Sequence, residues 1–228
     1  MNYWQQLDSE TIPGSRSVMS LHQRGAELAI NVDGDQLMSS RQHGSEDALA
    51  ELSLDRLAAP ASARLLIGGL GMGFTLAAAL ARLGPTGEAV VAELVPAVIR
   101  WNRGVLGAVA GSPLDDPRAR IQEGDVVRII QGSRREWDAI LLDVDNGPEG
   151  LTRKSNDRLY TTAGLAAARK ALRPGGVLAI WSAGHSDAFT SRLKRAGYAV
   201  EVKTVRSHGK KKGARHVIWL ASAALPAR

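Results

Sequence analysis

After Pro60, short apolar segments of strand type alternate with segments of helical periodicity, and this alternation constrains the fold more than any other feature. Segments such as AILLD and VLAIW are almost wholly apolar, which is typical of parallel strands covered on both faces. The alternation predicts an α/β protein with a doubly wound parallel sheet. The predicted strands are Arg64–Gly68, Glu88–Glu93, Ala119–Glu123, Trp137–Asp143 and Val177–Ser182, and the predicted helices are Phe74–Leu83, Pro96–Arg103, Val126–Gln131 and Thr161–Leu172.

Both ends of the chain add antiparallel structure to this pattern. Residues 1–16 look weakly ordered, after which Ser17–His22, Glu27–Val32 and Gln36–Ser39 predict a small β-unit with a tight turn at Asp33-Gly34. A helix capped by Ser45 should follow, ending at about Ala58. At the other end, a helix at Asp187–Ala196 precedes a predicted antiparallel hairpin of Tyr198–Val205 and Val217–Ala221.

The composition excludes some classes of site. The 228 residues include no cysteine, so disulfides and thiolate metal sites are ruled out. The opening MNYWQQLDSE has no basic stretch followed by an apolar run, so we expect no signal peptide, and no window is apolar enough for a membrane helix. We therefore expect a cytoplasmic protein without a membrane partner.

The net charge of +6 permits contact with nucleic acid without requiring it. Part of the excess lies in the run Lys210–Lys212, between two strand-like segments, where a solvated hairpin tip is the preferred interpretation. We do not expect nucleic acid as a partner.

The first predicted strand runs into the glycine-rich segment IGGLGMG, which opens a helix. Glycine at 69, 71 and 73 lets the backbone turn sharply and approach a ligand closely. A dinucleotide-binding loop would need a small residue where Phe74 stands, whereas G-x-G-x-G is the spacing of S-adenosyl-dependent transferases. Gly69, Gly71 and Gly73 are therefore candidate ligand-binding residues, with a simple packed turn as the alternative.

Acidic residues follow the next two predicted strands. Glu93 ends the second strand, where a carboxylate can accept hydrogen bonds from both ribose hydroxyls. Asp125 follows the third strand, where it can accept a bond from an adenine amino group, cap the next helix, or do both. Since the carboxyl ends of parallel strands meet at one edge of the sheet, a nucleoside ligand accounts for these features together.

The fourth strand ends in Asp143-Val144-Asp145, followed by a turn. A sulfonium donor has a good leaving group, but an alkyl amine acceptor is protonated near neutral pH. A carboxylate can hold the ammonium, remove its proton and direct the lone pair. The sequence favours Asp143 as this base and Asp145 as a second cation-binding group, without a metal; a turn with capping aspartates is the alternative.

Over approximately residues 17–221 the chain resembles the spermidine/spermine synthase family. That family joins an N-terminal β-unit to a Rossmann-like sheet of the S-adenosylmethionine-dependent methyltransferase type, which implies a division into residues 1–44 and 45–228. The resemblance rests on the Val32-Asp33-Gly34 turn, Glu46, IGGLGMG, Glu93, Gly124-Asp125, DAILLDVDNGP, Leu159-Tyr160 and the Arg173-Pro174-Gly175-Gly176 turn.

The resemblance implies a function and a set of roles. Family members move an aminopropyl group from decarboxylated S-adenosylmethionine to a polyamine and release methylthioadenosine. Glu93 would then hold the ribose and Asp125 the adenine, and Asp143 would be the acid–base residue. Glu46 and Tyr160 would bind the amine substrate.

Three departures from the family pattern bear on the transferred group. The family loop G-G-G-D-G-G has an aspartate facing the donor amine, and Gly71 stands at its position. The family's Tyr-His-Glu becomes Gly44-Ser45-Glu46, and its D-x-x-D contracts to Asp143-Val144-Asp145.

Three functions follow from these patterns. An aminopropyltransferase acting on an amine is favoured by the front β-unit, Glu46 and the paired aspartates. An S-adenosylmethionine-dependent methyltransferase is favoured by Gly71, and a non-catalytic nucleoside-binding protein is disfavoured by Asp143. A homodimer is compatible with the sequence, which does not define the oligomeric state. We expect Trp101 on an exposed helix face.

Overall fold

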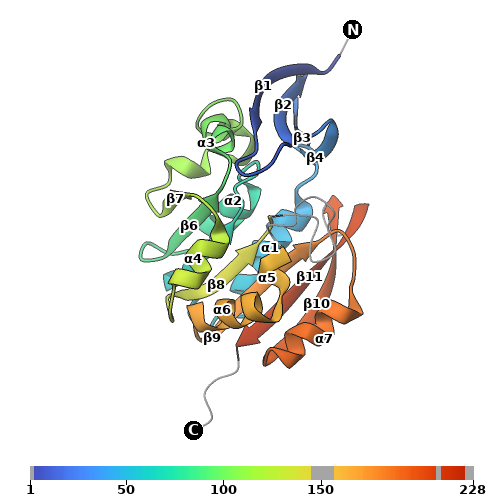
Figure 1. Cartoon of the computed structure of the whole chain (residues 1–228). Coiled ribbons are helices and arrows are strands. Elements are labelled where there is room, and N and C mark those ends of the chain that lie inside the picture. The colour runs from blue at the N-terminus through green and yellow to red at the C-terminus, as the bar shows by residue number, and fades with distance from the viewer. Residues whose placement is uncertain (1–2, 145–156, 209–211, 224–228) are drawn as a thin grey trace.

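The computed structural model describes residues 3–144, 157–208 and 212–223. It contains two β-sheets, and the smaller sheet lies above the carboxyl edge of the larger one in the view of Figure 1.

The smaller sheet is antiparallel with the order β1-β2-β3-β4, formed by Gln5–Thr11, Val18–Arg24, Glu27–Val32 and Asp35–Ser39. Asp33 and Gly34 have φ values of 51° and 93°, as a two-residue hairpin turn requires. The expectation that residues 1–16 are weakly ordered is wrong for β1, which pairs with β2. Its polar sequence QQLDSET carries no hydrophobic signal, so only the neighbouring strand reveals it.

The larger sheet has seven strands in the order β10-β11-β9-β8-β5-β6-β7. Its parallel part consists of β5 (Arg64–Gly68), β6 (Glu88–Glu93), β7 (Ala119–Glu123), β8 (Trp137–Leu142) and β9 (Leu172–Ser182). The hairpin of β10 (Tyr198–His208) and β11 (Lys212–Ala223) adds to β9 in antiparallel orientation. This confirms the predicted doubly wound sheet with a terminal hairpin.

Helices cover both faces of the larger sheet. Neighbouring residues of one strand point to opposite sides, so Leu65 and Ile67 pack in one hydrophobic cluster and Leu66 in another. The first cluster includes residues of α1 (Gly44–Leu54), α2 (Phe74–Arg82) and α3 (Pro96–Arg103). The second includes residues of α4 (Val126–Gly132), α5 (Asp157–Tyr160), α6 (Thr162–Ala171) and α7 (Asp187–Arg195). Three short 3₁₀ turns, η1 (Pro60–Ser62), η2 (Gly107–Ala110) and η3 (Pro113–Asp115), complete the described elements.

The helix before the glycine loop starts and ends differently from the prediction. His43, not Ser45, is the N-cap of α1, and it makes no side-chain capping hydrogen bond. The Ser45 hydroxyl instead donates to the Glu46 carboxylate at 2.6 Å. The last helical residue is Leu54, four residues before the expected end at about Ala58.

The two sheets share a core. Ile12, Leu21 and Ile30 of the N-terminal region lie in the same cluster as Leu70 beside β5. Trp101 of α3 is buried rather than exposed as expected, and its indole N–H donates to Asp8 of β1 at 2.8 Å. Because packing crosses the junction, the division at residues 44 and 45 stays a prediction.

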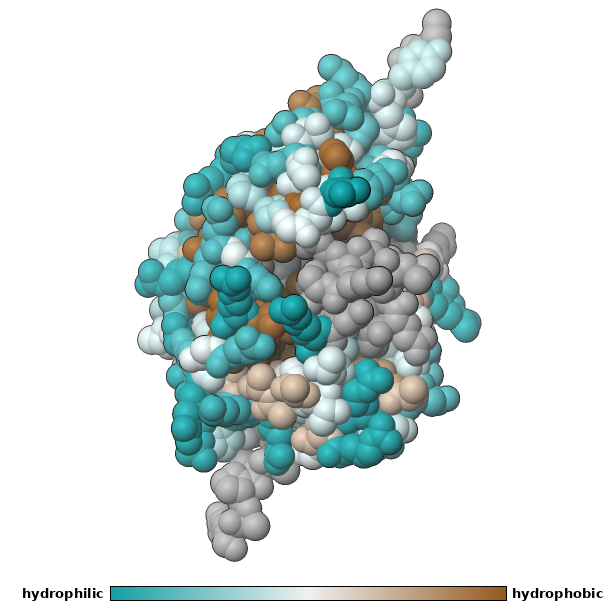
Figure 2. Space-filling view, in the orientation of Figure 1, coloured by the Kyte–Doolittle hydropathy of each residue, from teal (hydrophilic) through white to brown (hydrophobic). Residues whose placement is uncertain are grey.

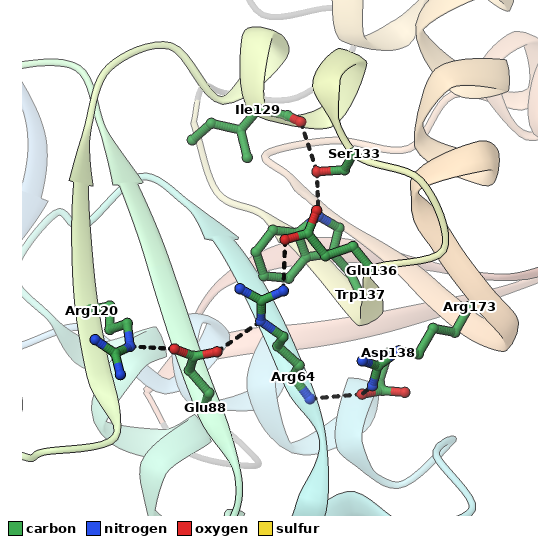
Figure 3. A network of polar contacts seen from close by, with 9 residues as sticks. All are labelled: Arg64, Glu88, Arg120, Ile129, Ser133, Glu136, Trp137, Asp138 and Arg173. Carbon is green, nitrogen blue, oxygen red and sulfur yellow. Dashed lines mark hydrogen bonds and ion pairs between the residues drawn. The ribbon is translucent and has the colours of Figure 1, made fainter.

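An ion-pair network ties the strand starts together at the opposite edge (Figure 3). The Arg64 guanidinium contacts Glu88 at 2.7 Å and Glu136 at 2.6 Å, and lies over the Trp137 ring. The backbone N–H of Arg64 donates to Asp138 at 2.7 Å. Arg120 and Arg173 extend the network to β7 and β9 through Glu88 and Asp138. These contacts support the order of the five parallel strands.

Hydrophobic side chains reach the surface mainly in the upper and middle parts of the face shown in Figure 2. In the smaller sheet, the large hydrophobic side chains that are exposed include Leu7, Val18 and Leu37. Among the described helices, none has the length and apolarity that crossing a membrane would require.

Candidate active site

The glycine loop adopts the conformation for which glycine is needed. Gly69, Gly71 and Gly73 have φ values of 89°, 53° and 87°, in the left-handed region that other residues rarely adopt. A side chain at Gly69 would place its Cβ 2.7 Å from the carbonyl oxygen of Asp143. The loop can therefore lie directly against the end of β8 only because position 69 carries no side chain.

A cavity lies between this loop and the smaller sheet. Its lower wall includes Gly69, Gly71, Glu93, Asp125 and Asp143, which come from four neighbouring strand ends of the larger sheet. The smaller sheet and its loops supply an apolar cover, which includes Ile12, Met19, Ile30, Val32, Leu37 and Met38. The structure thus brings three of the predicted carboxylates and the glycine loop to one site.

Glu93 supports the loop as well as lining the cavity. Its side chain is buried, and its carboxylate accepts hydrogen bonds from the backbone N–H groups of Leu70 and Val95, both at 2.8 Å. These bonds fix the glycine loop relative to the start of α3. A ligand role for Glu93 would therefore come in addition to a structural one.

Asp125 caps α4, as one of its two predicted roles requires. One carboxylate oxygen accepts the backbone N–H of Val127 at 2.8 Å, and the residue also lies on the cavity wall. The cap orients the carboxylate at the end of β7, where a ligand base could reach it.

Asp143 lies on the cavity wall beside a second acid, Glu46 of α1. The Thr75 hydroxyl is 3.5 Å from the Asp143 carboxylate and 3.4 Å from the Glu46 carbonyl oxygen. Burial raises the pKa of Asp143 to about 8, and the negative charge of Glu46 adds to this effect. Burial also raises the pKa of Glu46, although the Ser45 hydroxyl opposes the shift.

Three other predicted site residues that the structure describes, Gly73, Glu46 and Tyr160, are not among those that line the cavity. Tyr160 is buried in the second cluster, with its ring edge-on to Phe189 at 5.6 Å. Glu46 is buried in α1, so neither residue predicted to bind the amine substrate lines the described cavity. Asp145 falls outside the described residues. Among the described residues, no group of three or more acidic or histidine side chains is arranged to hold a metal ion.

Sequence reasoning missed three residues that shape the loop. Met38 of β4 occupies the space beside Gly71, because a Cβ at position 71 would lie 2.6 Å from its sulfur. The Asn102 side chain of α3 donates to the Gly71 carbonyl at 2.8 Å, and Thr75 contacts Asp143. Thr75 lies in α2, which follows β5, and Asn102 lies in α3, which follows β6. A place in the helix after a strand is only a weak sequence signal for a site residue. The sequence around Met38 carries no such signal.

The doubly wound sheet, the glycine loop and the acidic strand ends define an α/β architecture whose cavity, at the carboxyl ends of the strands, is covered by a small β-sheet. The chain belongs to the spermine/spermidine synthase domain family, whose model matches residues 48–188.

Two curated relatives are polyamine aminopropyltransferases. The protein of Korarchaeum cryptofilum (strain OPF8) is 32% identical over 114 residues, which cover 49% of this chain and 34% of the relative. That of Mycobacterium tuberculosis (strain CDC 1551 / Oshkosh) is 30% identical over 122 residues, which cover 50% of this chain and 23% of the relative. The match therefore spans about a third or less of each relative's length.

Solved structures share the fold over nearly the whole chain. A spermidine synthase in complex with the transition-state analogue AdoDATO superposes with a TM-score of 0.77 at 18% identity, covering 97% of this chain and 74% of that one. The spermidine synthase from Thermotoga maritima gives a TM-score of 0.74 at 18% identity, covering 97% and 73%. This confirms the fold class, including the small sheet in front of the larger one.

Proposed function

We propose that this protein is a spermidine synthase-like transferase that moves an aminopropyl group from decarboxylated S-adenosylmethionine to an amine acceptor of polyamine type. The observation that carries the proposal is the convergence of Glu93, Asp125 and Asp143 with the glycine loop on one cavity wall. The family membership and the aminopropyltransferase relatives support the same reaction.

In this proposal, each acidic residue has a separate role. Glu93 accepts hydrogen bonds from the ribose, which is compatible with its loop contacts because a carboxylate accepts up to about four. Asp125 binds the adenine amino group, and Asp143 removes the proton of the acceptor amine and directs its lone pair at the donor carbon. Asp145 attracts the acceptor cation. Binding of the amine by Glu46 and Tyr160 stays a prediction.

Replacing Asp143 tests the chemistry. Asp143→Asn keeps the side-chain shape but removes the proton acceptor, so turnover should fall by about a hundredfold or more. Affinity for methylthioadenosine, which is uncharged, should change little. Asp187→Asn on α7, where the carboxylate is 99% exposed, is the matched control and should leave turnover unchanged.

The assay incubates the protein with each donor and a panel of di- and triamines, and identifies the products by mass. A product that gains C₃H₇N supports aminopropyl transfer. If the Asp143→Asn protein keeps the turnover of the wild type, Asp143 is not the base. If no amine gives a product, the non-catalytic nucleoside-binding protein becomes the better account.

One observation favours methyl transfer as the second candidate. At the loop position where the family carries an aspartate, this chain has Gly71, with the Met38 thioether against it. A thioether does not repel the carboxylate of intact S-adenosylmethionine, which is the methyl donor. A product that gains only CH₂ in the same assay would establish this alternative.

A further inference from the structure

Two grooves lie at the amino edge of the larger sheet, where the parallel strands start, opposite the cavity. One groove, of about 440 Å³, is lined by residues of the loop before β8, the end of α6 and the start of β9. The other, of about 520 Å³, is lined by residues of α4 and of the starts of β5 and β7. Residues 132–136 contribute to both linings, so the two grooves adjoin across this loop.

Eight cationic side chains are among the described residues that line the two grooves. Three of them, Arg64, Arg120 and Arg173, belong to the network of Figure 3, which matches them with three acids. The other five are exposed, namely Arg128, Arg134, Arg135, Arg169 and Lys170. In the described part of the chain, no acidic side chain forms an ion pair with any of these five.

The excess of positive charge at this edge is large and extended. Five unmatched cations compare with a net charge of +6 for the whole chain. A helix C-terminus attracts cations, which accounts for Arg169 and Lys170 in the last turn of α6 but not for the others. Four strand-to-strand steps separate β9 from β7, and each step is about 4.8 Å, so the row from Arg173 to Arg120 extends over roughly 19 Å. A surface of this length fits a chain of negative charges rather than a single anion.

The chemistry of the lining favours phosphates as those charges. Seven of the eight cations are arginine, whose planar fork can donate two parallel hydrogen bonds to one phosphate group. A duplex carries one charge per about 1.7 Å of its axis, so a stretch of roughly 19 Å presents about eleven phosphates. A protein partner would in addition need an apolar centre. The large hydrophobic side chains that are exposed in the described chain, such as Leu7, Leu37 and Val105, line neither groove.

We infer that these two grooves, called here the arginine edge, bind the phosphate backbone of nucleic acid without reading its sequence. Trp137 lines one groove but is 2% exposed, so it offers the bases no ring to stack on. In the linear sequence the eight cations are dispersed between residues 64 and 173, and the expectation of no nucleic-acid partner took account only of the net charge and of Lys210–Lys212. The inference does not rest on the proposed function, because the cavity lies at the other edge of the sheet.

Fluorescence anisotropy with labelled duplexes of about 20 base pairs tests the arginine edge. The logarithm of the binding constant should fall linearly with the logarithm of salt concentration between about 50 and 200 mM. The slope should be about −4.5, because each of five phosphate contacts contributes about −0.9. A duplex of scrambled sequence should bind equally well, and saturating methylthioadenosine should leave the affinity unchanged. Parallel measurements with DNA and RNA, each as duplex and single strand, identify the form that binds most tightly.

A double variant locates the contact. Arg134→Gln with Arg135→Gln should weaken binding about tenfold or more and make the salt slope shallower by about 2. Lysine at both positions keeps the charge and should restore most of the slope. The matched control is Arg16→Gln with Arg103→Gln, which removes the same charge from exposed positions beside the smaller sheet and should change the affinity by less than about twofold.

Three results would overturn the inference. The first is a lack of binding to every nucleic acid at the lowest salt concentration. The second is an equal loss of affinity in the two glutamine double variants, which would mean that net charge alone attracts the probe. The third is equally strong competition by poly-glutamate at the same concentration of charge, which would favour an acidic protein as the partner. Turnover of amines does not enter these measurements, so they stand apart from the test of Asp143.

Discussion

At the residue scale, two of the cavity carboxylates perform a structural task beside the proposed ligand role. Glu93 holds the backbone of Leu70 and Val95, and Asp125 caps α4. Replacing such a residue by alanine removes both contributions together. A test of the ligand role therefore needs a substitution that keeps the backbone contact.

Asp125→Asn provides such a substitution. Asparagine caps helices about as well as aspartate, so the free energy of unfolding should change by no more than about 0.5 kcal/mol. Affinity for methylthioadenosine should fall by about 1–3 kcal/mol if the carboxylate accepts the adenine amino group. Thermal denaturation and calorimetry measure the two quantities.

Asp125→Ala is the comparison variant. It should lose about 1 kcal/mol of stability as well as affinity, because alanine cannot cap α4. If the Asp125→Asn protein binds the nucleoside as tightly as the wild type, the Asp125 carboxylate serves only as the cap of α4.

Many features of the site could be predicted from the sequence, because they depend on short segments at the strand ends. The glycine φ values, the Asp125 cap and the meeting of Glu93, Asp125 and Asp143 follow from where strands end in a parallel sheet. Met38 could not be predicted, because its contact with Gly71 depends on how the smaller sheet docks.

At the element scale, hydrophobic periodicity was sufficient for the parallel strands and their helices. It was insufficient for β1, whose side chains are mostly exposed and polar, and for the start of α1, where Ser45 turns to Glu46 instead of capping. The two errors have different causes: pairing with β2 determines β1, whereas at α1 a hydrogen bond between adjacent side chains occupies the Ser45 hydroxyl.

The network at the strand starts gives a prediction at this scale. Arg64→Met keeps the aliphatic part of the side chain over Trp137 but removes the charge shared by Glu88 and Glu136. Since these groups are partly exposed, we expect a loss of about 1–2 kcal/mol in the free energy of unfolding, measured with urea.

Arg82→Met is the matched control, because Arg82 pairs only with Asp55 in the described structure, on an exposed surface. It should cost about 0.5 kcal/mol or less. Equal losses in the two variants would mean that the network adds nothing beyond isolated surface pairs.

At the scale of the whole molecule, the two sheets meet where Met38 of β4 contacts the glycine loop. Gly71→Asp alone should destabilise the protein, because position 71 has a φ of 53° and the new Cβ would lie 2.6 Å from the Met38 sulfur, which would have to shift. With Met38→Ala added, the aspartate has room to face the donor amine. The double variant should prefer decarboxylated over intact S-adenosylmethionine by about tenfold more than the wild type does, or 1.4 kcal/mol.

Calorimetry with the two donors measures this preference, and Met38→Ala alone should leave it near the wild-type value. A strong preference for the decarboxylated donor already present in the wild type would show that another group discriminates between them.

The cavity draws its two walls from different stretches of the chain. The family model matches residues 48–188, which contain the glycine loop and the acidic strand ends, whereas the apolar cover comes from Ile12 to Met38. Substitutions in the cover can reshape the space around a ligand without touching the residues by which the family is recognised. The apolar cover can therefore vary in shape and volume while the acidic wall below it stays the same.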